Sequence, residues 1–228
     1  QVERSIADAR GGQPVHIDKL ALEWVRDRGR VEAVARGFTA MDKTRNVTFR
    51  ADRAMIALDS GSLLSFKVHP RQLRLEKGTA TVVRSADGVW TLADVVFAQE
   101  PAASDKPFDP IRDINWPTLA TPIRALISAG AFEQVELVDF HLDVDDRKSH
   151  NVWSASPVAG VWKATKEGVS LSLDITLANA IAGEPNRIRI ALASDGKVER
   201  AAGRVTVEGV DPVSVARMFG YSGDAFTS

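Results

Sequence analysis

VSLSLDITL, residues Val169–Leu177, is the stretch of sequence that decides the predicted fold. Every odd-numbered residue in it is apolar, and the residues between them are serine, serine, aspartate and threonine. Strict alternation of this kind is typical of a β-strand with one apolar face and one polar face. Most of the chain repeats the alternation with lower fidelity, so the sequence predicts a long sheet with one continuous apolar side.

The composition is that of a globular protein, with 44% hydrophobic and 26% charged residues among 228. This length allows one large β domain or two smaller units. The net charge of -1 argues against nucleic acid as a main partner, because phosphate binding needs a basic surface. The absence of cysteine excludes disulfides and thiolate metal sites. No apolar run is long enough to span a bilayer, and because the chain begins at Gln1 we expect it to be a piece of a longer protein.

Alternation and turn residues predict a series of strands along the chain. In the first of them the apolar phase slips by one residue at Asp18-Lys19, which predicts a β-bulge. Glu76–Gly78 is predicted as a turn between two strands. The predicted strands are Val15–Trp24, Val31–Ala40, Val47–Ala51, Ala54–Leu58, Gln72–Leu75, Thr79–Val83, Val89–Val96, Phe132–Leu137, Phe140–Asp145, Val152–Trp162, Val169–Leu177, Arg187–Ala193 and Arg204–Glu208.

Helices are predicted at a few places between and after the strands. Thr121 as N-cap, Pro122 at the first turn and Gly130 as the stop predict one helix, and Asp211-Pro212 begins another that ends near Met218. The predicted organisation is a lead-in over residues 1–14, a first β-groove repeat unit over 15–98, a proline-rich linker over 99–116, and a helix with a second repeat unit over 117–228.

An internal repeat is visible in the sequence. Leu73–Val82 runs parallel to Val135–Val144, and each segment is followed by a charged turn and a tryptophan, Trp90 or Trp153. Two amphipathic strands resemble one another by chance, which is the simpler alternative. The shared spacing favours a structural repeat, because repeated supersecondary units stack into elongated folds.

The sequence shows no catalytic motif, and we predict neither an enzyme nor a cofactor. His141, Asp143 and Asp145 share one face of a predicted strand, and imidazole with carboxylates could bind a divalent metal. That face lies opposite the strand's apolar residues, so a solvated polar face is the favoured interpretation and no metal site is predicted. The five tryptophans are interpreted as core plugs or end caps.

The predicted apolar face needs a cover, because an amphipathic sheet must bury that face against something. A second sheet would give a closed sandwich. The inward positions are mostly Val, Leu, Ile and Ala, and only 7% of the residues are aromatic. A smooth aliphatic lining of this kind suits acyl chains.

Several segments resemble AsmA-like proteins, in particular their YhdP branch. These segments are His16–Trp24, Arg71–Trp90, Val135–Arg147 with Trp153, and Val207–Met218, so the resemblance spans nearly all of residues 15–219. Such proteins are related to TamB and the bridge-like lipid transfer proteins. The resemblance implies a periplasmic protein anchored in the Gram-negative inner membrane by an N-terminal helix, which this sequence lacks. It also implies a taco-shaped sheet along which phospholipids move to the outer membrane, without catalytic residues.

The expected fold is mainly β with a few short helices, in an elongated, strongly curved antiparallel sheet that forms a taco-like groove built from repeats. The expected function is passive phospholipid transport between the inner and outer membranes, supporting envelope integrity. Expected partners are phospholipid acyl chains, the inner membrane, and outer-membrane or other envelope proteins. The alternative is a non-catalytic interaction or assembly module of the envelope with a closed β core. Ile175 is expected to face the groove and Thr176 the outer surface. The predicted groove residues are Leu20, Leu22, Ile56, Leu58, Leu73, Leu75, Val135, Leu137, Leu142, Leu171, Leu173, Ile175, Ile188, Ile190 and Leu192.

Overall fold

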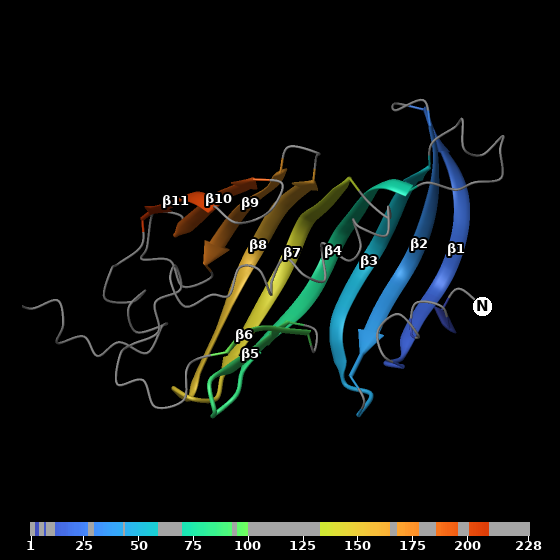
Figure 1. The fold of residues 1–228 in the computed structure, drawn as a ribbon. Helices are drawn as coiled ribbons and strands as arrows, with labels where there is room; N and C mark the ends of the chain where they lie inside the picture. The colour runs from blue at the N-terminus through green and yellow to red at the C-terminus, as the bar shows by residue number, and fades with distance from the viewer. Residues whose placement is uncertain are drawn as a thin grey trace, which may run out of the picture.

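A computed structural model describes residues 3, 4, 7, 12–26, 30–42, 44–58, 70–92, 95–99, 133–164, 168–177, 186–195 and 201–209. The described residues form one large sheet of eleven strands (Figure 1). The strands are β1 (Val15–Val25), β2 (Arg30–Met41), β3 (Val47–Leu58), β4 (Pro70–Arg84), β5 (Val89–Leu92), β6 (Val95–Gln99), β7 (Gln134–Asp146), β8 (Asn151–Ala164), β9 (Gly168–Leu177), β10 (Arg187–Asp195) and β11 (Ala201–Glu208).

The sheet is curved and not closed, with β1 and β11 at its two edges (Figure 1). Its strand order is β1-β2-β3-β4-β7-β8-β9-β10-β11, and β5 and β6 form a hairpin beside the end of β4. Neighbours in this order are also neighbours in sequence except at β4 and β7. The sheet is therefore assembled mainly from consecutive hairpins, as the alternating segments and turn residues predict.

The prediction of a wholly antiparallel sheet is wrong at β4 and β7, which pair in parallel from Gln72–Gln134 to Arg84–Asp146. Parallel neighbours need a connection of about a dozen residues or more to bring the chain back to the same end. The segment between Arg84 and Gln134 is long enough for that return and contains the β5–β6 hairpin. The sheet is consequently mixed.

Three predicted breaks are absent, because the chain continues through them as one strand. The predicted pairs of strands on either side of residues 52–53, 76–78 and 138–139 are the single strands β3, β4 and β7. Conversely, the predicted strand Val89–Val96 is the hairpin of β5 and β6. The predicted helices at 121–130 and 211–218, and most of the predicted linker, lie outside the described residues.

A row of local phase shifts explains why the alternation in the sequence breaks where the strands do not. Leu137 and Phe140 are three residues apart, so unbroken alternation would place them on opposite faces, yet both pack in one hydrophobic cluster. Asp139 between them has a φ of 58°, which shifts the phase of the alternation. Lys77 in β4 has a φ of 51° and Gly37 in β2 a φ of 64°.

The same shift occurs side by side in neighbouring strands. The paired residues on either side show which residues of this level face each other. They place Gly37 opposite Asp52, Asp52 opposite Lys77, and Lys77 opposite Asp139. Asp18 lies opposite Gly37, where its carboxylate fills the space of the missing side chain. We call Asp18, Gly37, Asp52, Lys77 and Asp139 the bulge row. Because each strand shifts at the same level, the apolar residues stay on one face. The predicted phase slip at Asp18-Lys19 lies in this row, but the register of β1 and β2 stays one-to-one across it, so it is not a β-bulge.

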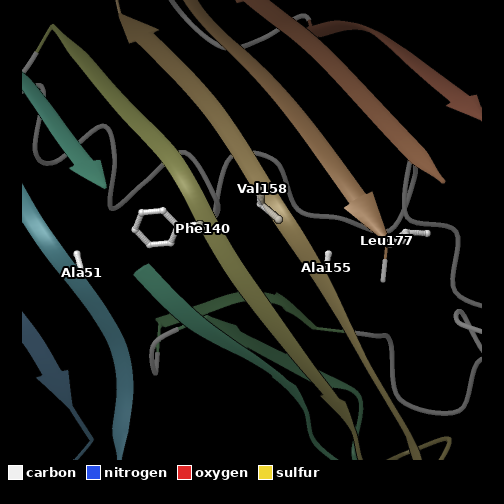
Figure 2. Close-up of a cluster of buried hydrophobic side chains, with 5 residues drawn as sticks. All are labelled: Ala51, Phe140, Ala155, Val158 and Leu177. Atoms are coloured by element: carbon white, nitrogen blue, oxygen red, sulfur yellow. The ribbon is translucent and has the colours of Figure 1, made fainter. Parts of the chain in front are cut away.

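Buried apolar residues lie on both faces of the sheet. Val34, Met55 and Ala57 are buried on the opposite face over β2 and β3, and two buried clusters lie on the apolar face. Ala51 of β3, Phe140 of β7, Ala155 and Val158 of β8 and Leu177 of β9 form one buried cluster (Figure 2). The Phe140 ring extends from β7 toward Ala51 across β4, as Figure 2 shows. A second buried cluster joins residues of β4, β5 and β7 and consists of Val82, Trp90 and Val144.

Candidate functional site

The apolar face of the sheet is the most extensive feature that the described residues build. Cα partners in adjacent strands point to the same face. Following those partners from β1 to β11 gives three rows, each crossing nine strands, in which every residue is apolar or glycine.

The rows run parallel to the bulge row and are named here by their members. The outer row is Leu22, Ala33, Ile56, Leu73, Val135, Trp162, Leu171, Leu192 and Gly203. The middle row is Leu20, Ala35, Ala54, Leu75, Leu137, Gly160, Leu173, Ile190 and Val205. The inner row is Ile17, Phe38, Ala51, Gly78, Phe140, Val158, Ile175, Ile188 and Val207.

The structure brings nearly all of the predicted groove residues together in these rows. Leu142 lies in the next row, opposite Ala80 and Ala155. Leu58 pairs with Pro70 after a shift in register and stands outside the rows. The remaining predicted residues are Leu20, Leu22, Ile56, Leu73, Leu75, Val135, Leu137, Leu171, Leu173, Ile175, Ile188, Ile190 and Leu192, and each belongs to one of the three rows. That they bind lipid stays a prediction.

The rows also contain residues that sequence reasoning missed. Phe38, Phe140 and Val158 lie beyond the bulge row, and Val205 and Val207 lie on the edge strand β11. Alternation counted separately on each side of a phase slip would have found the first three, because each side is regular by itself.

The exposure of this face differs between its edges and its centre. On β1 the relative exposures are 53% for Leu20, 70% for Leu22 and 61% for Trp24. In the centre the relative exposure is 3% for Phe140 and 0% for Ala51. The face is therefore filled by its own side chains in the middle of the curved sheet and open to solvent at both edges, where Val205 and Val207 on β11 are also exposed.

Aromatic packing fills the centre. The ring centroids of Phe38 and Phe49 lie 6.0 Å apart, and those of Phe49 and Phe140 lie 5.6 Å apart. Gly78 lies between β3 and β7, and a Cβ atom there would come within 2.5 Å of the Phe140 ring. Phe140 thus reaches Phe49 across the strand β4 because residue 78 has no side chain. The aromatic contacts form a bar across one level of the apolar face.

The opposite face is mostly polar, with many ion pairs, although Val34 and Met55 are buried on it over β2 and β3. Glu23 of β1 accepts hydrogen bonds of 3.0 Å from Arg36 of β2 and Arg53 of β3. The hydrogen bond from Arg36 and the positive charges of both arginines hold the pKa of Glu23 below its ordinary value. Farther along the sheet, Arg74 pairs with Glu76 at 2.7 Å and with Glu136 at 2.9 Å. Ion pairs of this kind, between strands or along one strand as for Arg74 and Glu76, suit a face that meets water.

His141, Asp143 and Asp145, the residues considered as metal ligands from the sequence, belong to two separate pairs. His141 Nε2 lies 2.9 Å from Asp143 Oδ1, and Arg147 donates a 2.9 Å hydrogen bond to Asp145. Within the described part of the chain, no three histidine, cysteine or acidic side chains are arranged to hold a metal ion. We assign no metal to this strand face.

The tryptophans fall into two groups. Trp90 and Trp162 are buried, as expected of core residues, and Trp153 packs against both hydrophobic clusters. Trp24 is an exception, because it stands exposed on the edge strand β1. Trp116 lies outside the described residues.

Comparisons with models of known protein families, with curated proteins and with solved structures find no match. In the described ranges of the chain, no helix has the length and apolar character needed to cross a membrane.

Proposed function

We propose that this chain is a periplasmic segment of an AsmA-like protein and that it carries phospholipids along the apolar face of its sheet. The observation that carries the proposal is the set of three apolar rows, which cross the sheet from β1 to β11 without a polar residue. A face that only had to build a core would not need to extend to both edge strands.

The exposed end of the face supports the proposal energetically. Leu20, Leu22 and Trp24 stand next to one another on one face of β1, each more than half exposed. Burial of apolar surface contributes roughly 25 cal/mol per Å². A contiguous exposed patch is thus a place where an apolar ligand gains free energy by binding. Acyl chains match the aliphatic side chains, and their headgroups would remain in water.

The pairing of β4 with β7 supports a repeat architecture. The two segments that resemble each other in sequence, Leu73–Val82 and Val135–Val144, lie side by side with the same alignment, residue for residue. Lys77 and Asp139 occupy equivalent positions in this alignment, and both have a positive φ. Equivalent residues with the same unusual backbone conformation are expected of a duplicated unit.

The filled centre of the face limits where cargo can lie. The cluster around Phe140 is buried in the centre of the face, whereas Leu22 on β1 is 70% exposed and Val207 on β11 is 48% exposed. We assign the first binding region to the β1 edge, because its apolar residues are more exposed than Val205 and Val207 on β11. Movement of a lipid across the whole sheet requires the aromatic bar of Phe38, Phe49 and Phe140 to shift aside.

The test is direct detection of bound lipid. The chain is purified without detergent, extracted and analysed by mass spectrometry, and uptake of a fluorescent phospholipid is titrated. We expect Leu22→Asp to weaken uptake and Lys19→Asp, at an exposed position of the same strand opposite Arg36 on the polar face, to leave it unchanged. A lipid-free protein that takes up no probe would overturn the proposal.

A second candidate is a non-catalytic assembly module of the envelope, in which the open sheet binds another protein and not lipid. It is favoured by the complete burial of Ala51 and Ala155 and by the two edge strands, which could pair with another chain. This candidate predicts that charge on β1 weakens association with a protein partner and leaves lipid uptake absent in every variant.

A further inference from the structure

A hollow on the polar face of the sheet has no role in the proposed lipid path. It lies over β3, β4 and β7 and is lined by Arg50, Asp52, Lys77, Gly78, Thr79 and Asp139. Arg50 and Thr79 are Cα partners that alternate with apolar-face residues, so their side chains stand on the opposite, polar face. Asp52, Lys77 and Asp139 belong to the bulge row and stand opposite one another on β3, β4 and β7.

The charges around the hollow differ from those on the rest of the polar face. Elsewhere on this face arginines pair with carboxylates across strands, as Glu23 does with Arg36 and Arg53. Among the described residues, the side chains of Arg50, Asp52, Lys77 and Asp139 make no hydrogen bond or ion pair. Two cations and two anions thus surround one hollow without satisfying each other, although adjacent strands are only about 4.8 Å apart.

Two residues that line the hollow have an unfavourable backbone conformation. Lys77 and Asp139 adopt left-handed conformations with φ of 51° and 58°, and Gly37 holds the equivalent place in β2. Glycine is the residue that adopts this conformation without steric cost. The chain therefore carries charged side chains at two positions where glycine would be more stable, and both line the hollow. Unfavourable conformations that persist in this way concentrate at functional sites.

We propose that this hollow binds a small zwitterion that combines an oxyanion with an ammonium group. Arg50, Lys77 and Thr79 supply a guanidinium, an ammonium and a hydroxyl as donors to the oxyanion. Asp52 and Asp139 flank Lys77 on the two neighbouring strands. Their carboxylates accept hydrogen bonds from the ammonium group of the ligand. A purely anionic ligand would meet two uncompensated carboxylates, and a metal ion would meet two uncompensated cations. A phosphoester with an amino group provides a countercharge for the carboxylates and for the cations.

The chemistry has two sources, a soluble phosphoamine or the headgroup of a zwitterionic lipid in a bilayer. The binding of O-phosphoethanolamine to the 228-residue chain is measured by calorimetry, and inorganic phosphate is titrated as the comparison. We expect saturable binding of phosphoethanolamine and about tenfold weaker binding of phosphate, which lacks the ammonium group. Failure of the wild-type chain to bind phosphoethanolamine would overturn the proposal.

The decisive variant is Lys77→Gly, because glycine relieves the left-handed conformation while it removes the ammonium group. We expect the melting temperature to stay the same or rise and the affinity to fall about tenfold to a hundredfold. Arg45→Gly is the matched control, since Arg45 has a φ of 67° in an exposed turn away from the hollow. It should leave affinity unchanged. Wild-type affinity in Lys77→Gly would contradict the site.

The carboxylates are tested with the double variant Asp52→Asn/Asp139→Asn, in which asparagine keeps the size of each side chain and tolerates the left-handed conformation. Its affinity for phosphoethanolamine should fall to that for phosphate. A persistent preference for phosphoethanolamine would overturn the ammonium part of the site. Cosedimentation with phosphatidylethanolamine vesicles, compared with phosphatidylglycerol vesicles, then distinguishes the sources: Lys77-dependent cosedimentation supports the lipid headgroup, and its absence beside soluble binding supports the free phosphoamine.

Discussion

Arg84 of β4 donates a 2.7 Å hydrogen bond to the carboxylate of Asp146, its Cα partner on β7, and both side chains are buried. The same carboxylate accepts backbone N–H groups of Lys148 and Ser149 at 3.1 Å. The Arg84 guanidinium also lies 5.2 Å from the centre of the Trp90 ring on β5. This pair therefore joins the ends of the two hairpins that the parallel ladder brings together.

Removing Arg84 should destabilise the fold, because it leaves a buried carboxylate without its countercharge. We expect Arg84→Ala to cost about 3–5 kcal/mol in the free energy of unfolding. Arg147→Ala is the control, because the Arg147–Asp145 pair is largely exposed and should contribute about 0–1 kcal/mol. Urea unfolding followed by tryptophan fluorescence measures both. Equal, small effects would show that the buried pair does not stabilise the junction.

The same pair predicts acid sensitivity. Burial alone would raise the pKa of Asp146, but hydrogen bonds from Ser149 and Arg84 outweigh burial and hold that pKa below its ordinary value of 3.8. A carboxyl whose pKa is lower in the folded state contributes its full stability above the unfolded value and loses it as the pH falls through the folded value.

Stability should thus decline below about pH 4 in the wild type. Asp146→Asn should be less stable at neutral pH and should show a shallower decline over the same acid range, since it has no proton to take up. Thermal melting across that range measures both slopes. Parallel curves for the two proteins would mean that Asp146 does not contribute to the acid transition.

The bulge row marks the limit of what the sequence could predict. Alternation correctly placed most strands and the members of the apolar face, because burial on one side imposes a period of two. The slip at Asp18-Lys19 was interpreted as a bulge and the equivalent slip at Glu76–Gly78 as a turn, since glycine beside charged residues is typical of both. In the structure both are phase shifts inside continuous strands whose register does not change. The parallel partner of β4 was also missed. A strand's own residues specify which face is buried and not which strand pairs with its edge.

Gly37→Ala should test the bulge row directly. A Cβ atom at this position would overlap the Asp18 side chain, and the φ of 64° is unfavourable for alanine. Gly12→Ala is the control for backbone conformation alone, because Gly12 has a φ of 85° with nothing within 4 Å of the added atom. We expect about 1–2 kcal/mol for Gly12→Ala and a larger loss for Gly37→Ala.

The difference between these variants should come from Asp18. The double variant Asp18→Ala/Gly37→Ala should therefore recover part of the stability that Gly37→Ala loses, as measured by chemical unfolding. If the two single glycine variants lose the same stability, Asp18 and Gly37 are not packed against each other across the edge of the sheet.

Gly78→Ala should disrupt the aromatic bar. The added Cβ would overlap the carbonyl oxygen of Arg50 and would lie 2.5 Å from the Phe140 ring, and neither backbone nor a buried ring can move easily. Overpacking of this kind costs about 1–3 kcal/mol. Gly203→Ala is the control, because its Cβ meets the end of the flexible Leu192 side chain on the edge pair. Near-equal melting temperatures for the two variants would argue against a filled centre.

Ile175 and Leu22 separate the filled centre of the apolar face from its open edge. Ile175 is half-buried and packs against the cluster that contains Phe140, whereas Leu22 is 70% exposed on β1. Ile175→Asp would place a carboxylate among apolar side chains, and the desolvation of a charge costs at least several kcal/mol. That cost is comparable with the whole stability of a domain, about 5–15 kcal/mol. We expect this variant to unfold or to melt at a much lower temperature.

Leu22→Asp should have the reverse profile, because its carboxylate stays in water: an unchanged melting temperature with weakened lipid uptake. Thr176→Asp is the control for charge on β9, since Thr176 stands on the polar face opposite Arg187, which can pair with the new carboxylate. It should retain both properties. If Ile175→Asp folds normally and loses lipid binding, the groove is open through the centre of the sheet. If Leu22→Asp binds lipid like the wild type, cargo does not lie against β1, because a charge there would remove the apolar contact on which its binding depends.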